Sequence, residues 1–213
     1  MILDYNASSH IARWRTRMRR TIPMIAFLVV SLLGCGNGDR PAEPQQAAVD
    51  LDPEDPSILV RPFTAEEIRD EWVPGLRLLI RRGAPEEPKI ERWTVVSADD
   101  EGAEIEYATI GEDGSVVGEA RVSRSGWTEL RDHAAFPAAY SSREWVRRST
   151  PLGDFEGWLY RVADPSTTVV QEFFFVPSLP GAPVQMRIYE DRELVFVLEQ
   201  IERLHLDSAS IGG

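Results

Sequence analysis

The chain of 213 residues has few of the side chains that most often carry chemistry, with one cysteine and three histidines. A zinc site needs three or four protein ligands, and no spare cysteine is present to supply them. No Gly-x-Ser-x-Gly elbow, phosphate-binding loop or His-Glu-x-x-His motif occurs. The sequence therefore predicts no cofactor, no metal site and no catalytic centre of a recognised kind.

Long hydrophobic runs are also missing. The apolar stretch from Ile22 to Leu33 has about a dozen residues, whereas a helix needs roughly 20 to cross a bilayer. It follows five arginines between Arg13 and Arg20, as in the basic region of a secretory signal. It ends in Leu32-Leu33-Gly34-Cys35, a tetrapeptide that contains the one cysteine and resembles the lipobox of bacterial lipoproteins. The resemblance implies that residues 1–34 are a signal peptide and that Cys35 is acylated and becomes the mature N-terminus.

Two alternatives for this N-terminal region stay open. In the first, the signal is cleaved without lipidation and the cysteine is incidental, which would leave a free thiol in an oxidising compartment. The second concerns the start of translation, because a start at Met18 instead of Met1 would place Met-Arg-Arg-Thr directly before the apolar stretch.

Positive charge is scarce in the part of the chain that would remain after cleavage. Without residues 1–34 it has 18 basic and 34 acidic side chains, a net charge near −16. Such a charge argues against nucleic-acid binding and against attraction to anionic lipid, since both need a positive surface. Membrane contact is therefore expected through an acylated Cys35 alone. Gly36 follows the cysteine where the lipoprotein sorting rule places aspartate for inner-membrane retention, which favours the outer membrane, facing the periplasm.

Residues 35–56 are rich in glycine, proline, glutamine, alanine and acid and poor in large apolar side chains. This composition cannot bury a core and predicts a disordered tether. The acidic run from Asp50 to Pro56 lacks the spaced pattern of a calcium-binding loop, so a solvated linker is the preferred interpretation.

Residues 57–206 are long enough for one domain, followed by a tail at 207–213. Thr64 and Glu67 form a capping box before a short helix, and a second helix is predicted at Trp127 to Ala135. Alternating apolar residues predict eight or nine strands, and a helical turn is expected near Ile201 to Leu204. The short connections favour antiparallel neighbours. The predicted fold class is therefore α+β, with an antiparallel meander sheet, curved or half-barrel, and two short helices.

Aromatic residues are the remaining candidates for binding. Trp93 and Trp158 lie in phase with other apolar residues of their strands, which predicts burial, whereas Trp127 and Trp145 lie in the least regular segment and are the candidate ligand-binding residues. The three phenylalanines at 173–175 place bulk on both faces of one strand and predict a central strand covered on both sides. The proline-rich turn at 180–183 predicts a rigid loop, with a docking element as the alternative.

The predicted architecture resembles the half-barrel proteins that carry and receive lipoproteins in the bacterial periplasm. The resemblance implies a non-enzymatic envelope lipoprotein that binds a lipid, a hydrophobic segment or an envelope partner. Gly118 and Ala120, if they faced Phe173 and Phe175 across the sheet, would leave room for an apolar cavity, and close packing is the alternative. A second function is a carboxylate-dependent hydrolase acting on envelope polymer. Paired acids such as Glu104 and Glu106 would supply the carboxylates of such a hydrolase, but they form no recognised catalytic motif.

Overall fold

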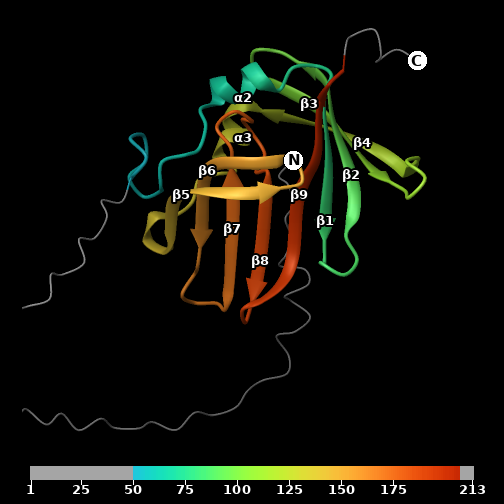
Figure 1. Cartoon of the computed structure of the whole chain (residues 1–213). Helices are drawn as coiled ribbons and strands as arrows, with labels where there is room; N and C mark the ends of the chain where they lie inside the picture. Colours follow the sequence, from blue (N-terminus) through green and yellow to red (C-terminus); the bar gives the residue numbers. More distant parts are fainter. Residues whose placement is uncertain (1–49, 207–213) are drawn as a thin grey trace, which may run out of the picture. The chain divides into compact units, whose positions relative to one another are not determined.

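A computed structural model of the chain describes residues 50–206. Their main feature is one open sheet of nine strands in the order β4-β3-β2-β1-β9-β8-β7-β6-β5, in which all neighbours are antiparallel (Figure 1). The strands are β1 (Leu76–Gly83), β2 (Lys89–Ala98), β3 (Gly102–Ile110), β4 (Val116–Gly126), β5 (Ser141–Thr150), β6 (Gly153–Val162), β7 (Val169–Phe175), β8 (Gln185–Glu190) and β9 (Glu193–His205). The helices are α2 (Ala65–Glu71), α3 (Trp127–Asp132) and the 3₁₀ turn η1 (Ala138–Tyr140). The predicted antiparallel sheet with two short helices is confirmed.

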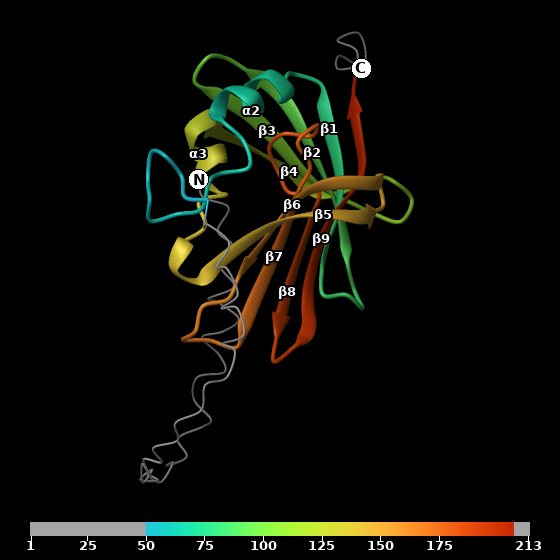
Figure 2. The same ribbon diagram turned by 60° about the vertical axis from the view of Figure 1, so that its left-hand side comes forward.

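The sheet is curved, and α2 and α3 lie on the same side of it (Figure 2). The capping box predicted at α2 is present, because the Thr64 hydroxyl accepts from the Glu67 backbone N–H while the Glu67 carboxylate accepts from the Thr64 N–H. Ile68 and Trp72 of this helix pack against the sheet residues that alternate along each strand. The main core contains these side chains together with Leu59, Phe63, Leu76, Leu78, Ile80, Trp93, Val95, Ala103, Ile105, Trp127, Ala134, Phe136, Tyr160, Phe175, Met186, Ile188 and Leu198.

The small residues expected to leave an apolar cavity do not face the large ones. Gly118 and Ala120 lie in β4 at one edge of the sheet, with five strands between β4 and β7, and both are exposed. They therefore do not face Phe173 and Phe175. The face that carries the helices is instead filled by close-packed side chains, several of them fully buried.

The opposite face of the sheet is covered by the hairpin of β5 and β6. Residues 158–162 of β6 pair with β7, whereas residues 153–157 pair only with β5, so the hairpin continues beyond β7 as a two-stranded ribbon. We call this part, residues 146–157, the arm. Its Val146, Leu152 and Phe155 pack on a second cluster formed by Leu159, Phe174, Val176 and Val184. The strand with three phenylalanines is thus covered on both sides, by the main core and by the arm.

The proline-rich loop at 180–183 packs against the end of α2. The Trp72 Nε1–H donates to the Pro180 carbonyl at 2.9 Å, and the Gln200 amide donates to the carbonyls of Ala182 and Pro183 at 3.1 Å. Gly181, with φ at +108°, lies directly against the Trp72 ring. These contacts favour the rigid-loop interpretation of the sequence over the docking element.

Residues 50–61 form a strap across the domain. A bridge pairs Leu51 with Leu59, the Leu59 N–H donates to the Phe136 carbonyl at 2.9 Å, and the Tyr160 hydroxyl donates to the Val60 carbonyl at 2.7 Å. Asp52 is only 6% exposed. The sequence placed residues 50–56 in the tether, whereas the structure places them on the domain.

Two further differences from the sequence prediction concern element ends. Residues 201–204, expected to turn helical, belong to β9, which extends to His205 and pairs with Leu76 of β1. The second helix ends at Asp132 and not at Ala135. Within residues 50–206, neither helix has the length and apolar composition needed to cross a membrane.

Candidate binding surface at the edge strand β5

The two edge strands of the sheet differ in how open they are to another strand. In β4 the pairing register to β3 shifts between Tyr107 and Thr109, and Gly118 has φ at +76°. Such an irregularity twists an edge and discourages further pairing. In β5 ten consecutive residues pair with β6 without a shift. Among residues 50–206, no backbone hydrogen bond joins β5 to any strand except β6. Within the described part of the chain, the outer edge of β5 is therefore a regular row of donors and acceptors that pair with no other strand.

An aromatic pair lies on this edge strand. Trp145 of β5 and Trp158 of β6 are directly opposite in the register, with ring centroids 5.0 Å apart at 79°. The Trp145 side chain is 50% exposed. An edge-to-face aromatic pair contributes about 0.5–1.5 kcal/mol beyond its buried area, so this large half-exposed ring has a fixed support.

The guanidinium of Arg143 also supports the Trp145–Trp158 pair. Arg143 lies two residues before Trp145, on the same side of β5, and its Cζ is 4.1 Å from the centroid of the Trp158 ring. Arg143 also donates to the Asp50 carboxylate at 2.6 Å. Its own side chain is 12% exposed, so it is held between the ring and the strap. The start of the described chain is thereby fixed beside β5.

Arg147 extends the same side of β5 past Trp145. It is 72% exposed, and its nearest acidic partner, Asp154, lies 3.7 Å away and is itself 59% exposed. An exposed ion pair of this length contributes little and is easily exchanged for another. Trp145 and Arg147 therefore form an accessible surface, with one apolar and one cationic member.

The arm is held in place by a buried carboxylate. Glu172 of β7 is 6% exposed and accepts from Arg161 of β6 at 2.6 Å and from Arg148 of the arm at 3.1 Å. Arg148 also donates to Gln185, which in turn donates to Glu199 at 2.8 Å. Burial alone would raise the pKa of Glu172, but the hydrogen bonds from the two arginines outweigh burial and lower it.

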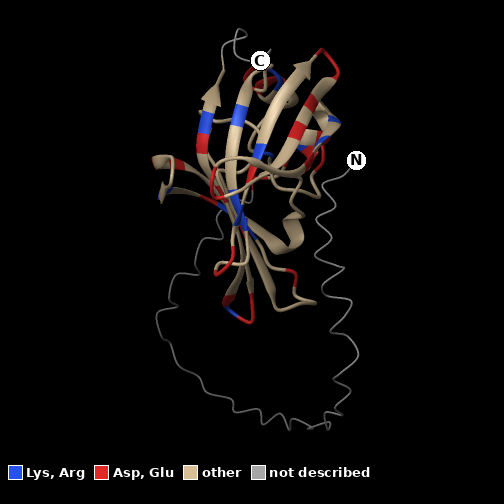
Figure 3. Cartoon of the chain, turned by 90° about the vertical axis from the view of Figure 1, so that its right-hand side faces the viewer, with Lys and Arg blue, Asp and Glu red and all other residues tan. Residues whose placement is uncertain are grey.

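Charged residues of both signs lie on neighbouring strands of the sheet, as Figure 3 shows by the red and blue bands. They include Arg92 of β2, which donates to Glu106 of β3 at 2.9 Å. Glu104, the other half of the carboxylate pair considered for hydrolysis, accepts from Ser97 at 2.7 Å. Each of these carboxylates thus has a cross-strand partner. In residues 50–206 no group of three or more histidine, cysteine and acidic residues is placed to hold a metal ion.

Replacing Glu172 with glutamine should loosen the arm in a pH-dependent way. Because the folded-state pKa is lowered, the ionised carboxylate stabilises the fold above its ordinary pKa of about 4.3, and this contribution is lost as pH falls below it. We expect Glu172→Gln to reduce the free energy of unfolding by about 2 kcal/mol at pH 7 and by much less near pH 3. Urea denaturation at both pH values measures the difference. A gap that does not close at low pH, or an equal loss in the exposed control Glu156→Gln, would contradict this account.

The structure separates the two tryptophans that the sequence singled out for binding. Trp127 is 5% exposed and its Nε1–H donates to the Asp99 carbonyl at 2.9 Å, so it belongs to the core and the prediction for it was wrong. Trp145 is exposed at the edge of the sheet, where it can meet a ligand. Cys35, the predicted lipidation site, lies outside the described residues.

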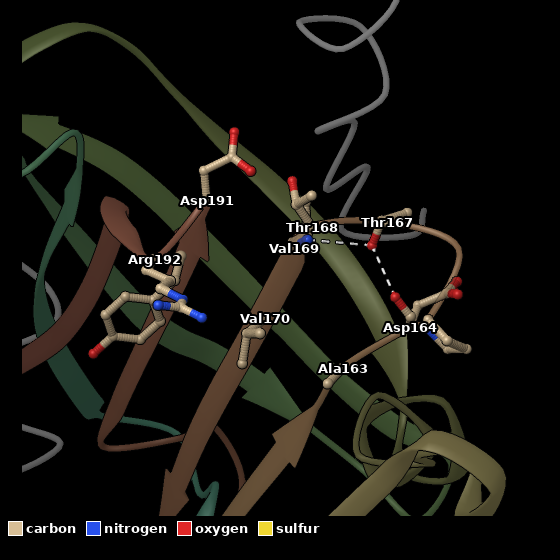
Figure 4. A pocket seen from close by; sticks show the side chains of 10 residues that line it. Ala163, Asp164, Thr167, Thr168, Val169, Val170, Asp191 and Arg192 are labelled. Carbon is tan, nitrogen blue, oxygen red and sulfur yellow. Dashed lines mark hydrogen bonds between the residues drawn. The ribbon is translucent and has the colours of Figure 1, made fainter. Parts of the chain in front are cut away.

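A shallow pocket of about 470 Å³ lies between the loop at 163–168 and the turn at 191–192, and the sequence reasoning did not find it (Figure 4). Both turn residues, Asp191 and Arg192, have positive φ. Thr167 accepts from the Val169 N–H at 3.3 Å and donates to the Asp164 carbonyl at 3.2 Å, which orders the loop. The pocket is open, and its floor is formed by Val169, Val170 and Tyr189.

Comparison with known proteins gives no family. No protein-family model matches the chain, and no curated protein matches it. Among solved structures, a Bacteroides fragilis protein with a YmcC-like fold, thought to be exported, is 12% identical, with a TM-score of 0.38 over 62% of this chain and 98% of its own. A Parabacteroides distasonis protein thought to be a lipoprotein is 10% identical, with a TM-score of 0.37 over 62% and 96%.

MucB of Pseudomonas aeruginosa, solved in complex with MucA, is 12% identical, with a TM-score of 0.47. The match covers 70% of this chain and 58% of that one. All three TM-scores lie below 0.5, so these likenesses leave the function open.

Proposed function

We propose that this protein is a lipid-anchored, non-enzymatic binding module of the bacterial cell envelope, which receives a partner protein at β5. The observation that carries the proposal is Trp145, a half-exposed tryptophan fixed by Trp158 on a regular, unpaired edge strand. Tryptophan and arginine are enriched among the residues that dominate protein interfaces, because a large rigid ring gains contact area at little entropic cost. Arg147 beside Trp145 supplies the second residue of this kind.

The packing of the domain favours a protein partner over a carried lipid. A lipid carrier needs an apolar cavity, whereas the space between the sheet and the helices is occupied by core side chains such as Trp72, Phe136 and Tyr160. The exposed features lie instead on an edge. A flat edge with an aromatic anchor suits a polypeptide segment better than an acyl chain.

The short stretch of chain between the predicted lipid anchor and the domain supports the same proposal. Fourteen residues lie between Cys35 and Asp50, and this stretch can span at most about 50 Å. Asp50 is bonded to Arg143 of β5. A lipidated Cys35 would therefore hold the β5 surface within this distance of the membrane, and Gly36 favours the outer membrane.

The proposal is tested by photo-cross-linking in living cells of the source bacterium. We expect p-benzoyl-L-phenylalanine in place of Ser149, an exposed residue of β5, to form one defined cross-linked species. The same probe in place of Val122, which is 56% exposed in β4, should not form it. Adding Trp145→Ala should reduce the yield at position 149 severalfold. No product at 149, or identical products at both positions, would refute a partner site at β5.

A further inference from the structure

The binding mode follows from the chemistry of β5, on the premise that the proposed function places the partner there. We infer that the partner contributes an extended segment that pairs with the free edge of β5 as a tenth strand. The segment carries an apolar side chain opposite Trp145 and an acidic side chain two positions away, opposite Arg147. Strand addition takes its affinity from main-chain hydrogen bonds and its specificity from alternate side chains.

The backbone supplies the first argument. The ten residues of β5 contain neither proline nor glycine, and their pairing with β6 is continuous. Natural sheets usually protect an edge with a bulge, a proline, charged side chains or a short strand. The other edge, β4, has such protection at Gly118. The strand β5 has no bulge or proline and only charged side chains as protection, so its edge can accept one more strand whose side chains complement those charges.

The side chains supply the second argument, because residues directly opposite each other on paired strands point to the same side. An incoming residue opposite Trp145 would lie against the exposed indole, and one opposite Arg147 would lie beside a guanidinium whose present partner is 3.7 Å away and exposed. Arg143 already donates a hydrogen bond to Asp50 and lies over the Trp158 ring, so it would not select a charged residue on the partner segment. The edge therefore selects one apolar and one acidic residue.

Two other occupants fit this edge less well. A second copy of the chain would bring together two chains that each have a net charge near −16 without residues 1–34, which electrostatic repulsion opposes. The chain's own residues 44–49, Pro-Gln-Gln-Ala-Ala-Val, are uncharged and offer nothing to Arg147. An acidic, apolar segment of an envelope protein matches both exposed side chains.

The test uses a peptide probe whose sequence reads the same in both directions, so that the result does not depend on strand orientation. Fluorescein-labelled Thr-Glu-Thr-Phe-Thr-Glu-Thr is titrated with the full mature protein in detergent, and binding is followed by anisotropy. Two N-methylated versions of the peptide are titrated in the same way. One carries backbone N-methyl groups on the second, fourth and sixth residues, and the other carries them on the third and fifth. Because backbone N–H groups alternate sides in a strand, strand addition predicts that one version loses binding and the other retains it.

Protein variants test the side-chain part of the inference. Arg147→Glu should weaken binding of the glutamate peptide about tenfold and favour the matching lysine peptide, since like charges directly opposite are destabilising. Arg192→Glu, an exposed arginine in the turn at 191–192, is the matched control and should leave affinity unchanged within about twofold. Trp145→Ala should weaken the binding of both peptides.

Several results would overturn the inference. These are no binding of the labelled peptide at any protein concentration in the titration, equal loss with both methylated versions, or an unchanged affinity in Arg147→Glu. A dimer that dissociates in Arg147→Glu would assign the edge to a second copy, and binding that appears only after residues 44–49 are replaced by a Gly-Ser sequence would assign it to the tether. If cross-linking at position 149 persists while the peptide results fail, the inference is wrong and the proposed function stands. If cross-linking also fails, both are wrong.

Discussion

Replacing Gly181 with alanine should destabilise the domain by about 3–5 kcal/mol, because a strained backbone and a steric clash coincide at this residue. Its φ of +108° is unfavourable for any residue with a side chain. A Cβ there would lie 2.2 Å from Nε1 and 2.6 Å from Cε2 of Trp72. The ring cannot move away easily, since Trp72 is 2% exposed and donates a hydrogen bond to Pro180.

Thermal denaturation measures this effect, and a loss of this size lowers Tm by about 10 °C in a domain of roughly 160 residues. Gly114→Ala is the matched control, because Gly114 has φ at +80° and no atom within 4 Å of an added Cβ. It should cost about 1 kcal/mol through backbone strain alone. Equal losses in the two variants would show that contact with Trp72 is unimportant.

Replacing Cys35 with alanine should either release the protein from the membrane fraction or stall its unprocessed precursor. Each buried methylene of an acyl chain contributes about 0.8 kcal/mol, so two or three chains bind a bilayer stably and their loss leaves an acidic protein without a membrane-binding element. Cell fractionation and mass measurement of the purified protein test this directly. Ser31→Ala is a suitable control, because it changes the same region without altering the tetrapeptide. An unchanged mass and fractionation in Cys35→Ala would end the lipoprotein assignment.

Local patterns predicted most strands and helix starts because their causes are local. The alternation of Leu76, Leu78 and Ile80 appears directly as a buried face, and the Thr64 capping box forms as the spacing indicates. The C-terminal strand was shortened in the prediction. Its helical end was inferred from a few residues, whereas pairing with β1 extends β9 to His205. Tertiary pairing overrode weak local preference.

Nonlocal contacts account for what the sequence could not predict. The strap looked like linker because its acidic residues are polar, yet Asp52 is buried. The backbone N–H groups of Glu54 and Asp55 and the guanidinium of Arg61 satisfy its carboxylate. Burial alone would raise the pKa of Asp52, but these hydrogen bonds have the larger combined effect, so the pKa is lowered. No spacing rule signals a partner nine residues along the chain.

The candidate site was found only in part for the same reason. Trp127 and Trp145 both lie in the segment with the least regular apolar pattern, and only the assembled sheet buries one and exposes the other. That β5 is an edge strand follows from the strand order, which no local pattern fixes. The register that places Arg143 over Trp158 depends on the β5–β6 hairpin. This hairpin leaves β7 at Gly157, where a Cβ would lie only 2.2 Å from the Phe175 carbonyl oxygen.

The strap also decides how the domain bears mechanical load. Tension on the chain at residue 50 first meets the Asp50–Arg143 ion pair, which joins the strap to β5, and then the Asp52–Arg61 ion pair within the strap. A partner held on β5 would pull at the same corner. Force between membrane and partner would then pass through the Asp50–Arg143 ion pair before it reaches the strap residues that contact α3 and the main core, such as Arg61 and Leu59. The first link to carry the load would therefore be the one that joins the strap to the proposed partner strand.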